Sequence, residues 1–84
     1  MGTEITVKKT TFEVEGCKEP CIEVSNGYCM VRISKCHRLI GRSSLYIREY
    51  LDGFYNGEDE FTGNFDLLSD EDAIRLARQY SAYL

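Results

Sequence analysis

The chain lacks the signatures by which enzymes, metal proteins and membrane proteins are usually found. It has a single histidine, His37, so any histidine-based triad would have to use that residue. It contains no Walker-type phosphate loop and no EF-hand calcium loop. No apolar run approaches the roughly 20 residues of a membrane span. We therefore expect no catalysis, no cofactor, no bound metal and no membrane insertion.

Length and composition predict one small domain over residues 1–84. The 84 residues are 43% hydrophobic and include six tyrosines and four phenylalanines, enough for a single core. A chain of this size buries roughly 60–65% of its unfolded surface, so its stability should be modest. The N-terminus lacks a basic stretch followed by an apolar one, so we expect no secretory signal and a cytoplasmic location.

The strongest strand signal is a β-hairpin over residues 21–34. Asn26-Gly27 is the preferred pair for a two-residue type I′ turn, because both central residues need a positive φ. Such a turn places Val24 opposite Cys29. Alternation then puts five side chains on the core face: Ile22, Val24, Cys29, Val31 and Ile33.

The segments on either side of the hairpin predict further strands. Residues 4–15 alternate, but their phase changes between Val7 and Phe12, which favours one bulged first strand. Residues 45–51 fit a strand or one face of a helix, and their residue types favour the strand. Residues 56–66 are polar and contain two glycines, so they predict an acidic loop.

A C-terminal helix is predicted over residues 70–84, with Ser69 or Asp70 as its cap. Glu71 and Arg75 stand at the favourable i, i+4 spacing. The apolar face consists of residues at helical spacing: Ala73, Leu76, Ala77, Tyr80 and Leu84. The whole pattern predicts an α+β fold, an antiparallel sheet of about four strands built on the Asn26-Gly27 hairpin, with this helix packed on one face.

Charge is divided into two blocks of opposite sign, although the net charge is −4. Five basic residues and no acid lie between Glu23 and Glu49, and nine acids and no base lie from Glu49 to Ile74. Blocks of one sign usually mark a solvated face or an interaction surface. Both interpretations of the acidic block stay open at this point.

As an interaction surface, the acidic block suits a protein partner with a basic surface. Carboxylates can imitate a phosphate backbone and occupy a partner's nucleic-acid-binding groove, and interleaved aromatic residues can anchor such an interface. By analogy of size and charge, the chain would be a non-enzymatic inhibitor or modulator of the kind that mobile elements make against host nucleases. The candidate residues are Glu49, Tyr50, Asp52, Phe54, Tyr55, Glu58, Asp59, Glu60, Phe61 and Asp66.

The alternative is a module, stapled by cysteines or zinc, that binds nucleic acid through the basic segment 32–48. The net negative charge of the chain disfavours this alternative, because nucleic-acid-binding domains are usually basic. The candidate basic residues are Arg32, Lys35, Arg38, Arg42 and Arg48.

Four cysteines leave three possibilities. The predicted hairpin register places Cys17 opposite Cys36, the best candidate pair for a disulfide. Zinc fits less well, because Cys29 would lie on the core face while Cys21 and Cys36 point the other way. Reduced thiols, with Cys29 buried and the others partly exposed, fit a cytosolic protein best. Cys36 and His37 are neighbours on a predicted strand and point to opposite faces, which disfavours a thiol enzyme.

Overall fold

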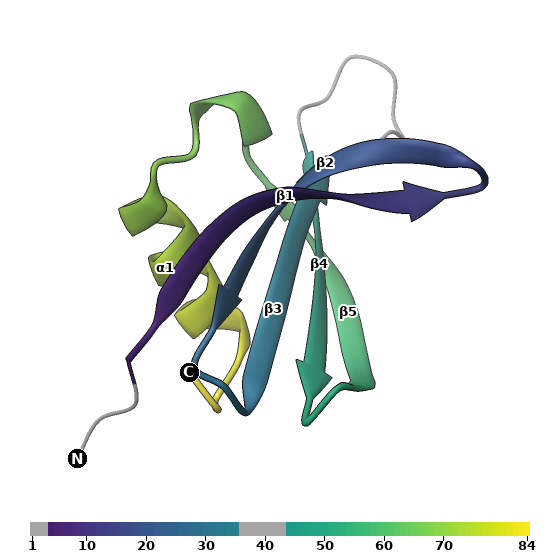
Figure 1. The fold of residues 1–84 in the computed structure, drawn as a ribbon. Coiled ribbons are helices and arrows are strands. Elements are labelled where there is room, and N and C mark those ends of the chain that lie inside the picture. The colour runs from purple at the N-terminus through teal and green to yellow at the C-terminus, as the bar shows by residue number, and fades with distance from the viewer. Residues whose placement is uncertain (1–3, 36–43) are drawn as a thin grey trace.

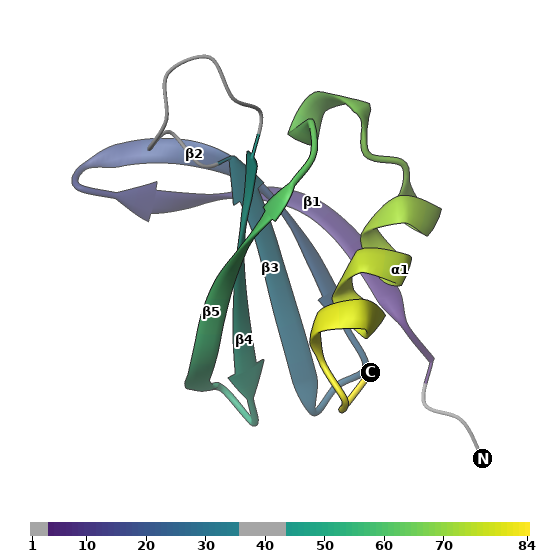
Figure 2. The same cartoon turned by 180° about the vertical axis from the view of Figure 1, so that it is seen from behind.

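The computed structural model describes residues 4–35 and 44–84, which form a five-stranded antiparallel sheet and one α-helix (Figure 1). The strands lie in the sheet in chain order: β1 (Thr6–Val14), β2 (Cys17–Ser25), β3 (Cys29–Lys35), β4 (Ser44–Leu51) and β5 (Phe54–Thr62). A 3-10 helix, η1 (Phe65–Leu67), leads into α1 (Asp70–Tyr80). Figure 2 shows α1 lying across one face of the sheet. The predicted α+β class is confirmed, with five strands instead of about four.

The core lies between this sheet face and α1. It draws its buried side chains from β2, β3, β4 and the helix, and they are Ile22, Val24, Cys29, Val31, Ile33, Leu45, Ile47, Ala73 and Ala77. The opposite sheet face, which we call the open face, carries no helix in the described part of the chain (Figures 1 and 2). No helix among the described residues is long and apolar enough to cross a membrane.

The central hairpin has a register different from the predicted one. Val24 faces Val31, not Cys29, so the strands are shifted by two residues relative to each other. A shift by two residues leaves each side chain on the same face of the sheet. The predicted core face is therefore correct although the predicted pairing is wrong.

The turn of this hairpin explains the shift. The backbone N–H of Asn26 donates to the carbonyl of Cys29 at 3.1 Å, which leaves Gly27 and Tyr28 as the turn residues. Gly27, the first of these two residues, has a φ of 93°, a conformation that favours glycine. The Asn26 side chain instead accepts hydrogen bonds from the N–H groups of Tyr28 and Cys29 at 3.0 and 2.8 Å. Asn26 thus acts as a side-chain cap and not as a residue of positive φ.

Type I′ turns occur at the two outer hairpins. Asp52 and Gly53 both have positive φ, at 51° and 85°, so the β4–β5 turn has the conformation that Asp-Gly favours. Glu15 and Gly16 form the corresponding turn between β1 and β2, with φ of 51° and 81°. Glutamate rarely takes a positive φ, and the sequence therefore gave little sign of this turn.

β1 contains no bulge, contrary to the prediction. Its pairing with β2 runs without interruption from Thr6 to Val14. The change of phase has another cause: Val7 packs against the core, whereas Phe12 points to the open face, where the guanidinium of Arg32 lies 5.0 Å from its ring centre. Phe12, although apolar, therefore packs against an arginine outside the core.

The prediction of an acidic loop over 56–66 is wrong for residues 56–62, which belong to β5. Residues 45–51 form most of β4, and β4 pairs with β5 so that Arg48 stands opposite Glu58. A polar edge strand is common, because charged side chains protect an unpaired edge from aggregation. Opposite charges on facing positions add to the stability of such a pair.

α1 begins with the predicted cap and ends earlier than predicted. The Ser69 hydroxyl accepts from the N–H of Asp72 at 3.1 Å, and the Asp72 carboxylate accepts from the N–H of Ser69 at 3.2 Å. Hydrogen bonds from the backbone N–H and the side chain of Ser69 to this carboxylate lower the pKa of Asp72. Arg75 pairs with Asp72 at 3.0 Å, not with the predicted partner Glu71. The helix stops at Tyr80, and residues 81–84 turn back toward the sheet.

Candidate protein-binding surface at the turn end of the sheet

Two hairpin turns and the C-terminal residues meet at one end of the sheet (Figure 1). The N–H of Asp52 donates to the carbonyl of Tyr28 at 2.7 Å, which joins the β4–β5 turn to the β2–β3 turn. The Asn26 amide donates to the carbonyl of Tyr83 at 2.8 Å, which holds the C-terminal residues against the same turn. We call this region, residues 26–28, 52–55 and 83, the turn end.

The turn end exposes four large aromatic side chains. Phe54 is 76% exposed, and Tyr55, Tyr28 and Tyr83 are 55%, 53% and 52% exposed. The rings of Tyr28 and Tyr83 meet edge to face with centres 6.2 Å apart, and Tyr55 meets Tyr50 in the same way at 6.0 Å. Phe54 faces Leu51 and Tyr55 faces Tyr50, so these two rings lie on opposite faces of the sheet at this end. Exposed aromatic side chains are typical of interaction sites, because each buries a large area with few rotatable bonds.

A buried carboxylate supports the turn end from inside. Glu49 is only 6% exposed and lies on the core side of β4. Its carboxylate accepts hydrogen bonds from the Ser81 hydroxyl and from the Asn56 amide, the latter at 2.8 Å. The Ser81 hydroxyl in turn accepts from the N–H of Tyr83 at 3.2 Å. Glu49 therefore connects β4, β5 and the C-terminal residues.

Glu58 is a carboxylate that contacts two tyrosines, the partly buried Tyr46 and the exposed Tyr55. It accepts hydrogen bonds from the hydroxyl groups of Tyr46 and Tyr55, which lie on β4 and β5. It also lies 4.0 Å from the guanidinium of Arg48. Asp52 is exposed in the β4–β5 turn itself. Two of the acidic candidates, Asp52 and Glu58, therefore lie close to aromatic side chains at this end of the sheet.

The acidic candidate residues are not all on one surface. Tyr50, Asp52, Phe54, Tyr55 and Glu58 lie at or beside the turn end. The others lie elsewhere: Glu49 is buried, Phe61 packs against Tyr80 of α1, Asp66 pairs with Lys35 at 3.1 Å, and Asp59 and Glu60 are exposed further along β5. Burial, and to a smaller extent the charges of Glu49 and other acids, raises the pKa of Tyr80.

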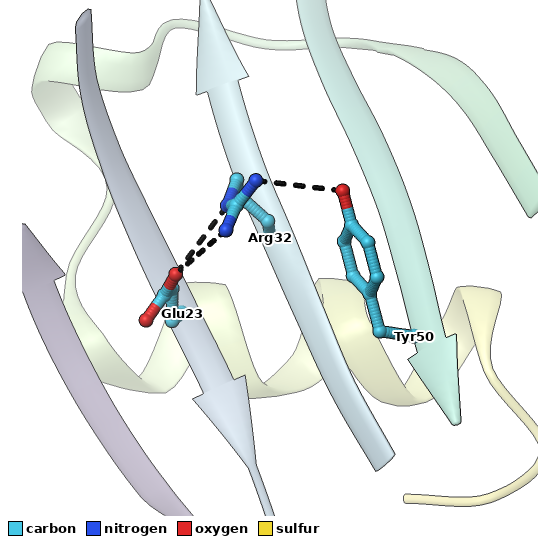
Figure 3. A network of polar contacts seen from close by, with 3 residues as sticks. All are labelled: Glu23, Arg32 and Tyr50. Carbon is cyan, nitrogen blue, oxygen red and sulfur yellow. Dashed lines mark hydrogen bonds and ion pairs between the residues drawn. The ribbon is translucent and has the colours of Figure 1, made fainter. Parts of the chain in front are cut away.

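The basic candidate residues in the described part of the chain each have an acidic partner. Arg32, on the open face, donates to Glu23 at 3.2 Å and to the hydroxyl of Tyr50 at 3.4 Å (Figure 3). Arg48 pairs with Glu58, and Lys35 pairs with Asp66. Arg38 and Arg42 lie outside the described residues. The described bases therefore do not form a free basic ribbon.

Two of the three cysteines in the described residues are buried. Cys29 was expected to be so, but Cys21, expected to be partly exposed, is 1% exposed. Burial raises the pKa of both thiols. Cys17 is exposed, and the register that paired it with Cys36 is wrong because of the two-residue shift. Cys36 lies outside the described residues, and no three possible metal ligands come together in residues 4–35 and 44–84.

These environments predict the order in which the thiols react. In the native protein iodoacetamide should modify the exposed Cys17 at the rate of a free thiol. Cys21 and Cys29 should react only after denaturation, because they are buried and their raised pKa leaves little of the reactive thiolate. Peptide mass spectrometry after a short pulse of reagent measures each site. Native labelling of Cys29 as fast as that of Cys17 would contradict the buried placement.

Sequence reasoning missed Tyr28 and Tyr83 as parts of this surface. Tyr28 follows Gly27 in a turn, a position typical of exposed side chains, and this was the available signal. Tyr83 follows the end of α1, and tertiary contacts with Asn26 and Tyr28 place it here. Comparison with protein-family models, curated protein sequences and solved structures gave no match to this chain.

Proposed function

We propose that the protein is a non-enzymatic binding module that presents the turn end to a basic surface of a partner protein. The observation that carries this proposal is the set of four exposed aromatic rings at the turn end, where hydrogen bonds join the two hairpin turns and the C-terminal residues. Rings held in a fixed arrangement lose little conformational entropy on binding, which favours their use as anchors.

A basic partner fits the charges around these rings. The chain has a net charge of −4, Asp52 is exposed within the turn end, and Glu58 lies beside Tyr55. Such a surface attracts a basic partner over long range and speeds association. A partner whose basic surface normally holds nucleic acid would be occupied and inhibited. Nucleic-acid binding by the chain itself is less favoured, because Arg32, Lys35 and Arg48 already have acidic partners.

Binding by the turn end is tested with cellular proteins that bind heparin, a class rich in nucleic-acid-binding surfaces. Immobilised wild-type protein should retain specific members, and duplex DNA should compete them off. The variant Phe54→Ala/Tyr55→Ala should bind such a partner at least about tenfold more weakly, since an anchoring residue contributes about 2 kcal/mol.

The matched control is Leu67→Ala, because Leu67 is as exposed as Phe54, at 76%, but lies in η1. This control should bind like the wild type. Equal retention by the double variant and the wild type would refute the proposed surface. A mobility shift of labelled DNA by the chain alone would instead favour the basic segment.

A further inference from the structure

The arginines of this chain show how the sheet holds a guanidinium group. Arg32 lies 5.0 Å from the ring centre of Phe12 and 5.3 Å from that of Tyr50, and Glu23 accepts its hydrogen bonds (Figure 3). Its side chain is 21% exposed. A guanidinium can therefore be held on this sheet between aromatic faces and a carboxylate, largely away from water.

Arg48 repeats the arrangement on the neighbouring strand. Its guanidinium lies 4.9 Å from the ring centre of Tyr46, and Glu58 provides the carboxylate. Arg48 and Arg32 face each other across β4 and β3, a pairing of like charges that would otherwise be unfavourable. Each lies near a ring and a carboxylate, although Arg48 has a single ring and its Nε, 4.0 Å from Glu58, makes no hydrogen bond.

The turn end has the ring and the carboxylate without the guanidinium. The rings of Phe54 and Tyr55 make no cation–π contact within residues 4–35 and 44–84. The carboxylate of Asp52, two residues before Phe54, makes no hydrogen bond or ion pair with the described residues. Tyr55, like Tyr46, donates its hydroxyl to Glu58.

We propose that the turn end binds arginine side chains of its partner, stacking a guanidinium on Phe54 or Tyr55 with Asp52 as the carboxylate. This inference rests on the proposed function and specifies the partner's chemistry. A guanidinium is planar and weakly hydrated, so it stacks on a ring and still donates hydrogen bonds at its edge. A lysine ammonium is compact and strongly hydrated, and it gains less from the ring. The surface therefore selects arginine over lysine.

Two synthetic peptides of equal length and charge test this selection, one alternating arginine with serine and the other lysine with serine. Titration into the ¹⁵N-labelled full chain at low salt gives both dissociation constants and the residues whose signals shift. The arginine peptide should bind about tenfold more tightly, as a cation–π contact strengthened by a carboxylate allows. Signals of residues 52–55 should shift most.

Variants locate the effect. Phe54→Ala/Tyr55→Ala should bring the affinity for the arginine peptide to that for the lysine peptide, and Asp52→Asn should weaken binding of both. Leu67→Ala should change neither value. Equal affinity of the wild type for both peptides, with shifts at the turn end, would reject arginine selection while leaving a basic partner in place. Absence of binding by either peptide would overturn both proposals.

Discussion

Replacing Ile47 with alanine is expected to lower the free energy of unfolding by about 3 kcal/mol, the typical cost of removing a large aliphatic side chain from a core. Ile47 is fully buried in the middle of β4 and faces Ile33 on β3. Its side chain lies in the core between the sheet and α1. The backbone of β4 is paired on both sides, so the cavity cannot close by movement of an edge strand.

Chemical denaturation followed by circular dichroism measures this loss. Ile47→Val, which removes one methylene group, should cost about 1 kcal/mol and serves as the graded control. Leu67→Ala, at an exposed position, should change stability by less than about 0.5 kcal/mol. A loss below about 1 kcal/mol for Ile47→Ala would mean that β4 does not pack against the core as described.

The sequence predicted the core because alternation survives errors in pairing. The hairpin register was wrong by two residues, yet Ile22, Val24 and Ile33 lie on the predicted face and are buried. The period of a strand is two residues, and a shift by two therefore preserves every inward-facing side chain. A shift by one residue would have inverted the whole face.

The open face was harder to predict, because its contacts join strands that are distant in the chain. Phe12 was interpreted as a sign of a bulge, whereas it packs on Arg32 from β3. The acidic segment was interpreted as a loop because its glycines and carboxylates are unfavourable in strands. For Glu58, the pairing with Arg48 on β4 outweighs the weak preference of glutamate against strands.

The two charge blocks are likewise redistributed by the fold. Arg48 of the basic block lies beside Glu58 of the acidic block, and Lys35 pairs with Asp66. The sheet therefore neutralises part of each block internally. The surface that we propose for a partner is the turn end, whose composition depends on which turns meet, and local sequence patterns do not specify that.

Glu49 links this candidate surface to the stability of the domain. Glu49→Ala removes the acceptor of the Ser81 hydroxyl and of the Asn56 amide and leaves a cavity beside Cys29. Removal of a buried carboxylate also relieves its desolvation, which offsets part of the loss. We expect a net decrease of about 2 kcal/mol in the free energy of unfolding.

The matched variant Glu49→Gln separates shape from charge. Its amide oxygen can accept from Asn56 while its amide nitrogen donates to the Ser81 hydroxyl, so we expect a loss of less than about 1 kcal/mol. Denaturation curves measure both losses. An alanine variant as stable as the glutamine variant would show that these hydrogen bonds do not outweigh the cost of burying the carboxylate.

The alanine variant should also change the turn end locally. The N–H of Tyr83 donates to Ser81, whose hydroxyl Glu49 fixes, so hydrogen exchange of the Tyr83 amide should accelerate in Glu49→Ala more than that of the core strands. If Tyr83 is part of the binding surface, the same variant should also bind a basic partner more weakly than its loss of stability accounts for. Unchanged exchange at Tyr83 would mean that Asn26 alone holds the C-terminal residues in place.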